Sequence, residues 1–171
     1  MTSKLKTVTI PKGIPGTITL LQKGVRIHAI EGMSIREFMT EAIGLSADYA
    51  EKRVRAIFVN SSPVDDIDGV KIKDQDIISL SGALPGICGI AMSRDTVISG
   101  FRSDISARTS DAVRQGNAII TVKLFNLVAS ESGALLLEKG VIVDSVDVLE
   151  ALKENSPSEI NSKSGSILLK I

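Results

Sequence analysis

The single cysteine, Cys88, is the side chain of this sequence best suited to covalent chemistry. It lies in the stretch Pro-Gly-Ile-Cys-Gly-Ile, residues 85–90. A reactive thiolate requires a lowered pKa, which nearby positive charge or a helix N-terminus provides. The flanking residues are apolar, and the nearest basic residue along the chain is Arg94. We therefore expect Cys88 to be a small buried hydrophobic residue, with a thiol-dependent enzyme using Cys88 as an alternative.

The only histidine, His28, lies in a segment that alternates between apolar and polar residues. If Val25 and Ile27 face the core, this alternation points His28 outward. A catalytic pair with a serine or with Cys88 would require His28 as the base. We expect His28 to be a surface residue instead.

An acidic run at residues 65–69, Asp-Asp-Ile-Asp-Gly, has the composition of a calcium loop. An EF-hand loop requires a glutamate at its twelfth position. Counted from Asp66, the twelfth residue is Ile77. The sequence therefore predicts a solvated acidic turn and no metal site.

A glycine-rich loop and the arginines that follow it form the candidate binding site. Backbone N–H groups of such loops can bind anions, and arginine binds carboxylates and phosphates through paired hydrogen bonds. The loop lacks the Lys-Ser/Thr ending of a P-loop and the spacing of a dinucleotide fingerprint. A tight connection and a solvated face with weak ion pairs are the alternatives. The candidate residues for a partner or anion site are Gly82, Pro85, Gly86, Gly89, Arg94, Arg102 and Arg108.

The composition narrows the function classes. Lysine plus arginine and aspartate plus glutamate number 20 each, and aromatic residues make up 3%. A nucleic-acid binder needs excess positive charge and usually aromatic stacking partners, so we expect none. One cysteine permits no intrachain disulfide, the first residues lack the apolar run of a signal peptide, and the uncharged stretch 77–93 is broken by glycine, proline and serine. We expect a cytoplasmic protein without a cofactor or membrane contact.

The first half of the chain predicts strands around one helix. A hairpin is expected at Lys23-Gly24, and a helix should begin at Ser34, because Glu37 completes a capping box, and end at Gly44. A shorter helical turn is expected at 46–52. The predicted strands are Lys6–Pro11, Thr17–Gln22, Val25–Ile30, Arg55–Asn60 and Ile77–Ser81.

The second half predicts mainly strands. Expected strands are 96–101, 118–128 and 167–171, with a turn at 130–133, a strand or hairpin at 134–143, and a helix from Asp144 or Ser145. Residues 20–27, Leu-Leu-Gln-Lys-Gly-Val-Arg-Ile, match residues 136–143, Leu-Leu-Glu-Lys-Gly-Val-Ile-Val. Shared hairpin chemistry and a duplicated unit both explain this match.

Residues 59–64, Val-Asn-Ser-Ser-Pro-Val, and residues 70–80, Val-Lys-Ile-Lys-Asp-Gln-Asp-Ile-Ile-Ser-Leu, form a recognisable pair. They resemble the sulfur-carrier proteins of molybdopterin and thiamin synthesis, which have a β-grasp fold. That family carries Val-Asn-Gly-x-x-Val followed by Leu-x-Asp-Gly-Asp-x-Val. The resemblance extends from Gly16 to Gly86 and implies a mixed sheet with one helix across it.

The same resemblance bears on function. The family acts through a C-terminal Gly-Gly, whose carboxylate becomes a thiocarboxylate, and its members dock by a sheet face and a flexible tail. Here Pro85-Gly86 stands at that place and the chain continues to Ile171. Sulfur carriage would thus require cleavage after Gly86, which is an alternative function.

We therefore expect an α+β chain with three parts: an N-terminal strand and lead-in (1–15), a β-grasp-like domain (16–86) and a β-rich α+β region (87–171) packed on it. A mixed sheet covered by a helix buries these faces. The expected function is a non-enzymatic protein-binding or assembly module, with a protein partner or a homo-oligomer. The last strand would close the sheet or pair with another chain.

Overall fold

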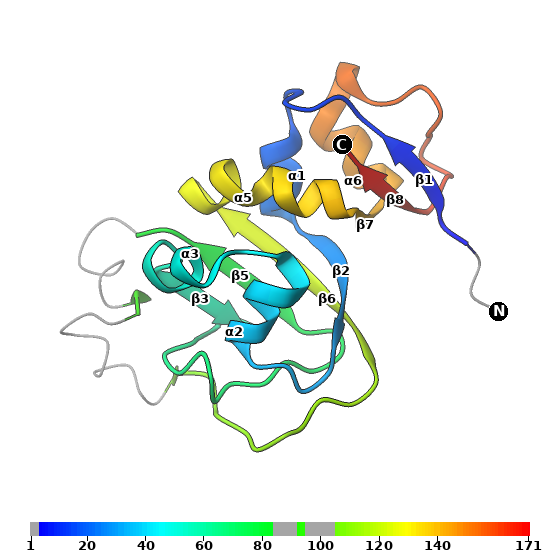
Figure 1. Cartoon of the computed structure of the whole chain (residues 1–171). Helices are drawn as coiled ribbons and strands as arrows, with labels where there is room; N and C mark the ends of the chain where they lie inside the picture. The colour runs from blue at the N-terminus through cyan, green and yellow to red at the C-terminus, as the bar shows by residue number, and fades with distance from the viewer. Residues whose placement is uncertain (1–3, 84–91, 95–104) are drawn as a thin grey trace.

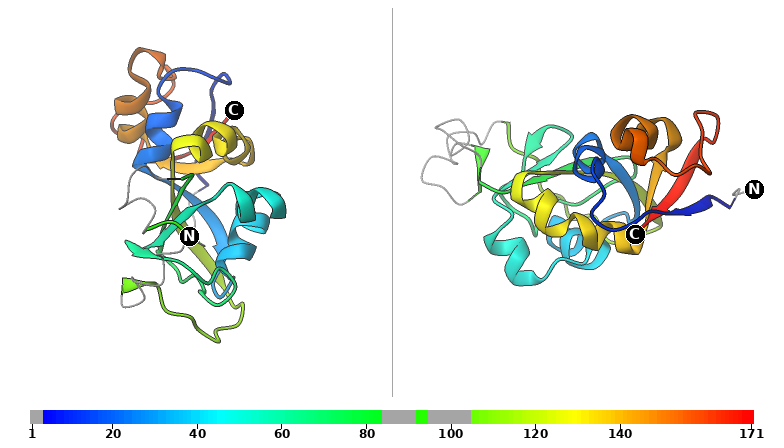
Figure 2. Two further views of the ribbon diagram at one scale, coloured as in Figure 1. Left: turned by 90° about the vertical axis from the view of Figure 1, so that its left-hand side faces the viewer. Right: turned by 90° about the horizontal axis from the view of Figure 1, so that it is seen from above.

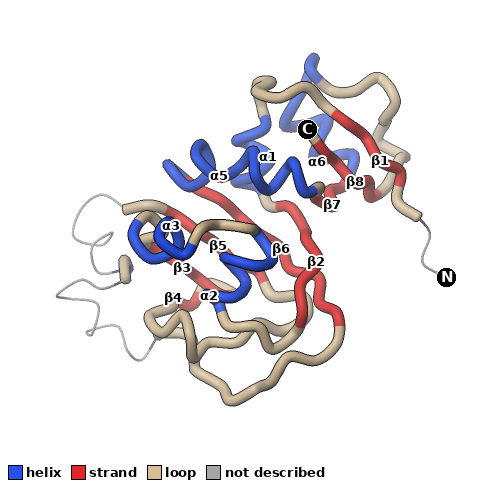
Figure 3. Tube along the Cα trace, viewed as in Figure 1, coloured by secondary structure: helices blue, strands red, loops and turns tan. Residues whose placement is uncertain are grey.

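The computed structural model describes residues 4–83, 92–94 and 105–171. The strands of these residues form one mixed sheet, which makes the chain α+β, as predicted (Figures 1 and 3). In order across the sheet, the strands are β1 (Lys6–Thr9), β8 (Ser166–Lys170), β7 (Val141–Asp144), β2 (Val25–Ile30), β6 (Asn117–Phe125), β5 (Ile77–Ser81), β3 (Ala56–Val59) and β4 (Ser62–Pro63).

Helix α1 (Thr17–Lys23) replaces the first strand of the predicted hairpin. The alternation Thr-Ile-Thr-Leu suggested a strand, but the adjacent Leu20 and Leu21 are both buried. A strand would point two neighbouring side chains to opposite faces, whereas a helix can bury both in one core. The prediction of a strand at Thr17–Gln22 was therefore wrong.

The internal sequence match is explained by a helix that ends at a glycine and continues as a strand. Helix α5 (Asn126–Lys139) ends at Gly140 as α1 ends at Gly24, and β7 and β2 follow. Both glycines have positive φ, 123° at Gly24 and 97° at Gly140. Neither copy is a hairpin, so the predicted hairpin chemistry was wrong at both places.

The main helix begins where its capping box predicted. Ser34 Oγ accepts from the Glu37 N–H at 3.1 Å, and the Ser34 N–H donates to Glu37 Oε2 at 2.8 Å. Helix α2 (Ile35–Glu37) continues as the π-helical segment η1 (Phe38–Ile43), which ends at Gly44. The φ of Gly44 is 95°. Ile35, Phe38, Met39 and Ile43 are buried, so this helix packs on the sheet as expected. Helix α3 (Ala47–Lys52) confirms the second, shorter helical turn.

Strand β6 occupies the centre of the sheet. It pairs antiparallel with β2, where Val25 lies opposite Val122, and parallel with β5, where Ile77 lies opposite Thr121. The resemblance had placed the whole sheet within residues 16–86. A strand from the second half fills it instead, so residues 16–86 share their sheet with residues beyond Gly86.

The two turns of the sulfur-carrier-like motif have the geometry that glycine favours, although glycine is absent from both. Asn60 and Ser61 link β3 to β4 with φ values of 48° and 72°, as in a type I′ turn. Gln75, between Asp74 and Asp76, has φ of 69°. Both places where this chain departs from the family's glycine thus keep a left-handed backbone.

The C-terminal half is α+β but holds more helix than predicted. β6 ends at Phe125, and residues 126–139, expected to be strand and turn, form helix α5. Helix α6 (Ser145–Leu152) was predicted and is followed by the short η3 (Lys153–Asn155). β8 pairs with both β7 and β1, so the last strand lies inside the sheet and β1 forms the edge beside it. The predicted strand 96–101 lies outside the described residues.

Helices α2, α3 and α5 lie over one face of the β2-β6-β5-β3 part of the sheet (Figure 2). Side-chain contacts join these helices: Tyr49 Oη donates to Glu131 Oε2 at 2.7 Å, and Lys139 Nζ donates to the Glu41 carbonyl of η1 at 3.4 Å. Helix α1 packs between α5 and α6. The core is therefore one-sided and lies between the sheet and this layer of helices. Among the described residues, no helix has the length and apolar character needed to cross a membrane.

Replacing Ser61 with glycine is expected to stabilise the protein. A non-glycine residue in the left-handed region costs about 1–2 kcal/mol, and the greater entropy of unfolded glycine offsets part of that gain. We expect Ser61→Gly to raise the free energy of unfolding by about 0.5–1 kcal/mol in chemical denaturation. The neighbouring Ser62→Gly, in strand β4, is the control and should give no gain. A Ser61→Gly protein less stable than the wild type would contradict the turn geometry.

Candidate functional site

Most of the predicted site residues lie outside the described part of the chain. These are Pro85, Gly86, Gly89, Arg102 and the cysteine Cys88. Of the remaining three, Gly82 is buried at the end of β5, Arg94 is buried beside α3, and Arg108 is exposed beside β4. These three candidate residues therefore do not gather into one site.

Arg94 binds the main chain at the end of helix α3. It is 2% exposed. Its Nη2 donates to the carbonyl of Ala50 at 3.0 Å and to that of Val54 at 2.6 Å, and its Nε donates to the Val54 carbonyl at 3.2 Å. A guanidinium at a helix C-terminus satisfies carbonyls that lack a helical partner. In the described structure Arg94 thus joins α3 to β3, a structural role that the sequence did not suggest.

The other residues considered from the sequence hold ordinary positions. His28 is exposed on β2, as its alternation predicted. In the acidic run, Asp66 Oδ1 accepts from the N–H groups of Asp68 and Gly69, which closes a local turn. The hydrogen bond from Arg36 lowers the pKa of Asp68 below its ordinary value. Among the described residues, no group of acidic, histidine or cysteine side chains is arranged to hold a metal ion.

The face of the sheet opposite α2, α3 and α5 carries apolar side chains at its surface. On β6, residues 118, 120, 122 and 124 are buried, and the alternate residues are half-buried. The register places Ile119 beside His28, and Phe125 beside Ser81. Ile30 is 38% exposed and Ile77 is 41% exposed. We call this surface the open face; its apolar members are Ile30, Phe58, Ile77, Ile119 and Phe125.

A hollow of about 320 Å³ lies on the open face at the carboxyl ends of β5 and β6. Phe58 and Phe125 line it, together with Ser79, Ser81 and Asn126. Asn126 Nδ2 donates to Ser81 Oγ at 3.1 Å, which fixes the polar rim. Aromatic-lined hollows of this kind accept an apolar side chain of a partner.

The charge on the open face is mainly positive. Arg26 Nη2 pairs with Asp144 Oδ1 at 2.7 Å, so this carboxylate is already neutralised. Lys123, half-buried on β6, makes no ion pair with any described residue. Among the strands that form this face, none contributes a further carboxylate. The face is therefore complementary to a surface that combines apolar and acidic groups.

Sequence reasoning missed the open face because its residues come from four strands, β2, β6, β5 and β3, which must be placed side by side to see it. The alternation of residues 118–124 was a usable signal for a one-sided strand, but the sequence does not say which strands flank it.

No known protein family, curated protein or solved structure matches this chain.

The turn at residues 73–76 is attached to β6 through Asp74. Asp74 Oδ1 accepts from the Ile119 N–H at 2.8 Å, and this bond lowers the pKa of Asp74 below its ordinary value of 3.8. The Gln75 N–H in turn donates to the Ile119 carbonyl at 3.0 Å. The Thr121 N–H also donates to the Asp76 carbonyl at 3.0 Å, so the turn is joined to the centre of the sheet at two residues of β6.

Replacing Asp74 with asparagine should destabilise the protein in a pH-dependent way. A lowered pKa means that the ionised carboxylate stabilises the fold above 3.8 and loses this effect as pH falls through the folded-state pKa. We expect Asp74→Asn to lower the denaturation midpoint at neutral pH, with a difference from the wild type that shrinks on acidification. The exposed Asp111→Asn is the control. A difference that grows at low pH would contradict this assignment.

Replacing Arg94 with glutamine should destabilise the protein far more than the same replacement of Arg108. Arg94→Gln removes several charge-assisted hydrogen bonds from a buried site, and we expect it to lower the free energy of unfolding by about 3 kcal/mol. Arg108→Gln alters an exposed side chain and should change it by less than about 0.5 kcal/mol. Chemical denaturation of both variants measures this. Equal effects would show that Arg94 has no special structural role.

Proposed function

We propose that this chain is a non-enzymatic protein-binding module that recognises its partner through the open face. The observation that supports this most directly is the hollow between Phe58 and Phe125 on a sheet face with exposed isoleucines. Exposed apolar groups that gather on one face mark interaction surfaces. Aromatic residues in such a patch supply much of the binding energy.

The partner should present apolar side chains and at least one carboxylate. A side chain of the partner would fill the hollow, and its carboxylate would meet Lys123, which no described residue neutralises. A second copy of this chain is a poorer match, because the open face offers Lys123 and only one carboxylate, which Arg26 already binds. Charge complementarity of this kind selects between partners. The proposal therefore favours a different protein over a homo-oligomer through this face.

Site-specific cross-linking tests this proposal. A photo-reactive amino acid at Ile77 or at Ile119 should capture the same partner protein in native cells. Val146, which is 43% exposed on α6, is the matched control position and should not capture it. The identified partner is then purified and its affinity measured by calorimetry.

The affinity measurements decide the outcome. Lys123→Glu should weaken binding by about tenfold or more, because it places a carboxylate against the partner's acidic group. Lys163→Glu, on an exposed loop, should leave it unchanged. Cross-links mainly to a second copy of this chain, equal capture from Val146, or unchanged affinity of Lys123→Glu would each overturn the proposal.

A further inference from the structure

A cavity of about 290 Å³ lies beside the β3–β4 turn, apart from the hollow on the open face. The turn residues Asn60 and Ser62 form one wall. The opposite walls come from the segments 70–73 and 107–110. Three basic side chains, Lys71, Lys73 and Arg108, reach this cavity from two segments that are distant in sequence.

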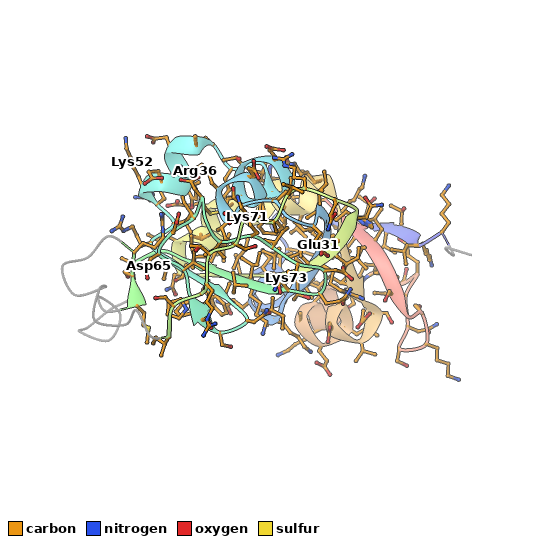
Figure 4. All side chains as sticks on the ribbon, turned by 90° about the horizontal axis from the view of Figure 1, so that it is seen from below. Glu31, Arg36, Lys52, Asp65, Lys71 and Lys73 are labelled. Atoms are coloured by element: carbon orange, nitrogen blue, oxygen red, sulfur yellow. The ribbon has the colours of Figure 1, made fainter. Side chains whose placement is uncertain are left out.

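The burial of their neighbours determines the direction of the two lysines. Val70 and Ile72 are buried, while Lys71 is half-buried and Lys73 is exposed. This alternation turns both lysines outward from the core. Figure 4 shows them on the underside of the molecule. Their position therefore follows from the burial of their apolar neighbours.

The backbone on both sides of Arg108 is held by hydrogen bonds. The Ala107 N–H donates to the Pro63 carbonyl at 2.7 Å, and the Ser110 N–H donates to the Gly69 carbonyl at 2.9 Å. The segment 107–110 thus lies against β4 and the acidic turn. The third cation is carried by an anchored backbone, which reduces the entropy lost when it binds a ligand.

The charges around this cavity are not balanced by the residues that line it. Lys73 and Arg108 make no side-chain hydrogen bond or ion pair with any described residue, and Lys71 Nζ donates to the Asp68 carbonyl at 2.9 Å. The one lining carboxylate, Asp76, is buried and accepts from Asn60 Nδ2 and from the Lys73 N–H, both at 2.8 Å.

Acidic residues outside the lining already bind other groups. Glu31 Oε2, on the underside near Lys73 in Figure 4, accepts from the Asp74 N–H at 3.1 Å. Asp68 is paired with Arg36 at 2.7 Å and Glu37 with Arg114 at 3.1 Å, and both carboxylates also interact electrostatically with Lys71. The described lining therefore has three cations against one carboxylate, which favours a ligand with more than one negative charge.

A second cavity of about 630 Å³ adjoins the first and shares Ser62, Ala107 and Arg108 with it. Its other walls include the apolar residues Phe58, Pro63, Met92 and Ile105. Arg108 thus stands between a cationic and an apolar compartment. An anionic group with an apolar body fits both compartments at once.

We propose that these adjoining cavities bind an organic phosphate, with the phosphate among Lys71, Lys73 and Arg108 and its apolar part against Phe58, Pro63 and Ile105. Phosphate has the multiple charge that the three cations require, whereas a carboxylate carries one. The cations of this site lie outside the open face, whereas Phe58 lines both the second cavity and the hollow of that face.

Calorimetry and NMR titration with phenyl phosphate test this site. We expect saturable binding that moves the amide signals of residues 71–73 and 107–110. The double variant Lys73→Gln/Arg108→Gln should weaken binding by about tenfold or more, while Lys163→Gln should not change it. Thermal melts of both variants verify that the fold is intact.

Two comparison ligands separate the parts of the proposal. Inorganic phosphate lacks the apolar body and benzoate lacks the second charge, so both should bind more weakly than phenyl phosphate. Benzoate binding as tightly as phenyl phosphate would overturn the phosphate assignment, and inorganic phosphate binding as tightly would overturn the apolar part. No saturable binding up to about 10 mM, or equal affinity in the double variant, would remove the site altogether.

Discussion

The insertion of β6 between β2 and β5 is the constraint on which the rest of this structure depends. β6 forms an antiparallel ladder with β2 and a parallel ladder with β5, so it joins strands that the chain separates by more than one helix. Its alternate residues Ala118, Ile120, Val122 and Leu124 are all buried under the helices. A one-residue slip of β6 would exchange these residues with those of the open face. The core and the proposed binding surface are thus set by one register.

The same register explains why the polar turns of the motif are held so firmly. Asp74 binds the N–H of Ile119 in β6, and Asp76 binds the side chain of Asn60 across the β3–β4 turn. Asn60 Oδ1 also accepts from the Ile77 N–H at 2.9 Å, at the start of β5. These bonds hold Ser61 and Gln75 in left-handed conformations that cost free energy. The unfavourable backbone conformations persist because the surrounding hydrogen bonds leave the two turns no alternative geometry.

The sequence predicted those structural elements whose signals lie within a few neighbouring residues. The capping box of Ser34 and Glu37 lies within one helical turn, and the helix began there. The apolar runs at 17–23 and 126–139 are ambiguous, because short apolar stretches suit strand and helix alike. Only packing decided these: Leu21 meets Gly133 of α5, where a side chain on Gly133 would come within 2.4 Å of the leucine. The three basic residues of the anion cavity could not be grouped from sequence, because Arg108 lines the same cavity as Lys73 only through the hydrogen bonds of residues 107 and 110 to Pro63 and Gly69.

The position of β6 also bears on the choice between a binding module and a processed sulfur carrier. The resemblance places the carrier's terminus at Gly86, before the polypeptide that supplies β6. Cleavage after Gly86 would leave the central strand held only by non-covalent contacts with β2 and β5. A fragment that ended at Gly86 would lack the strand that pairs with both β2 and β5. This topology supports the proposed role of the open face over that of a released glycine end.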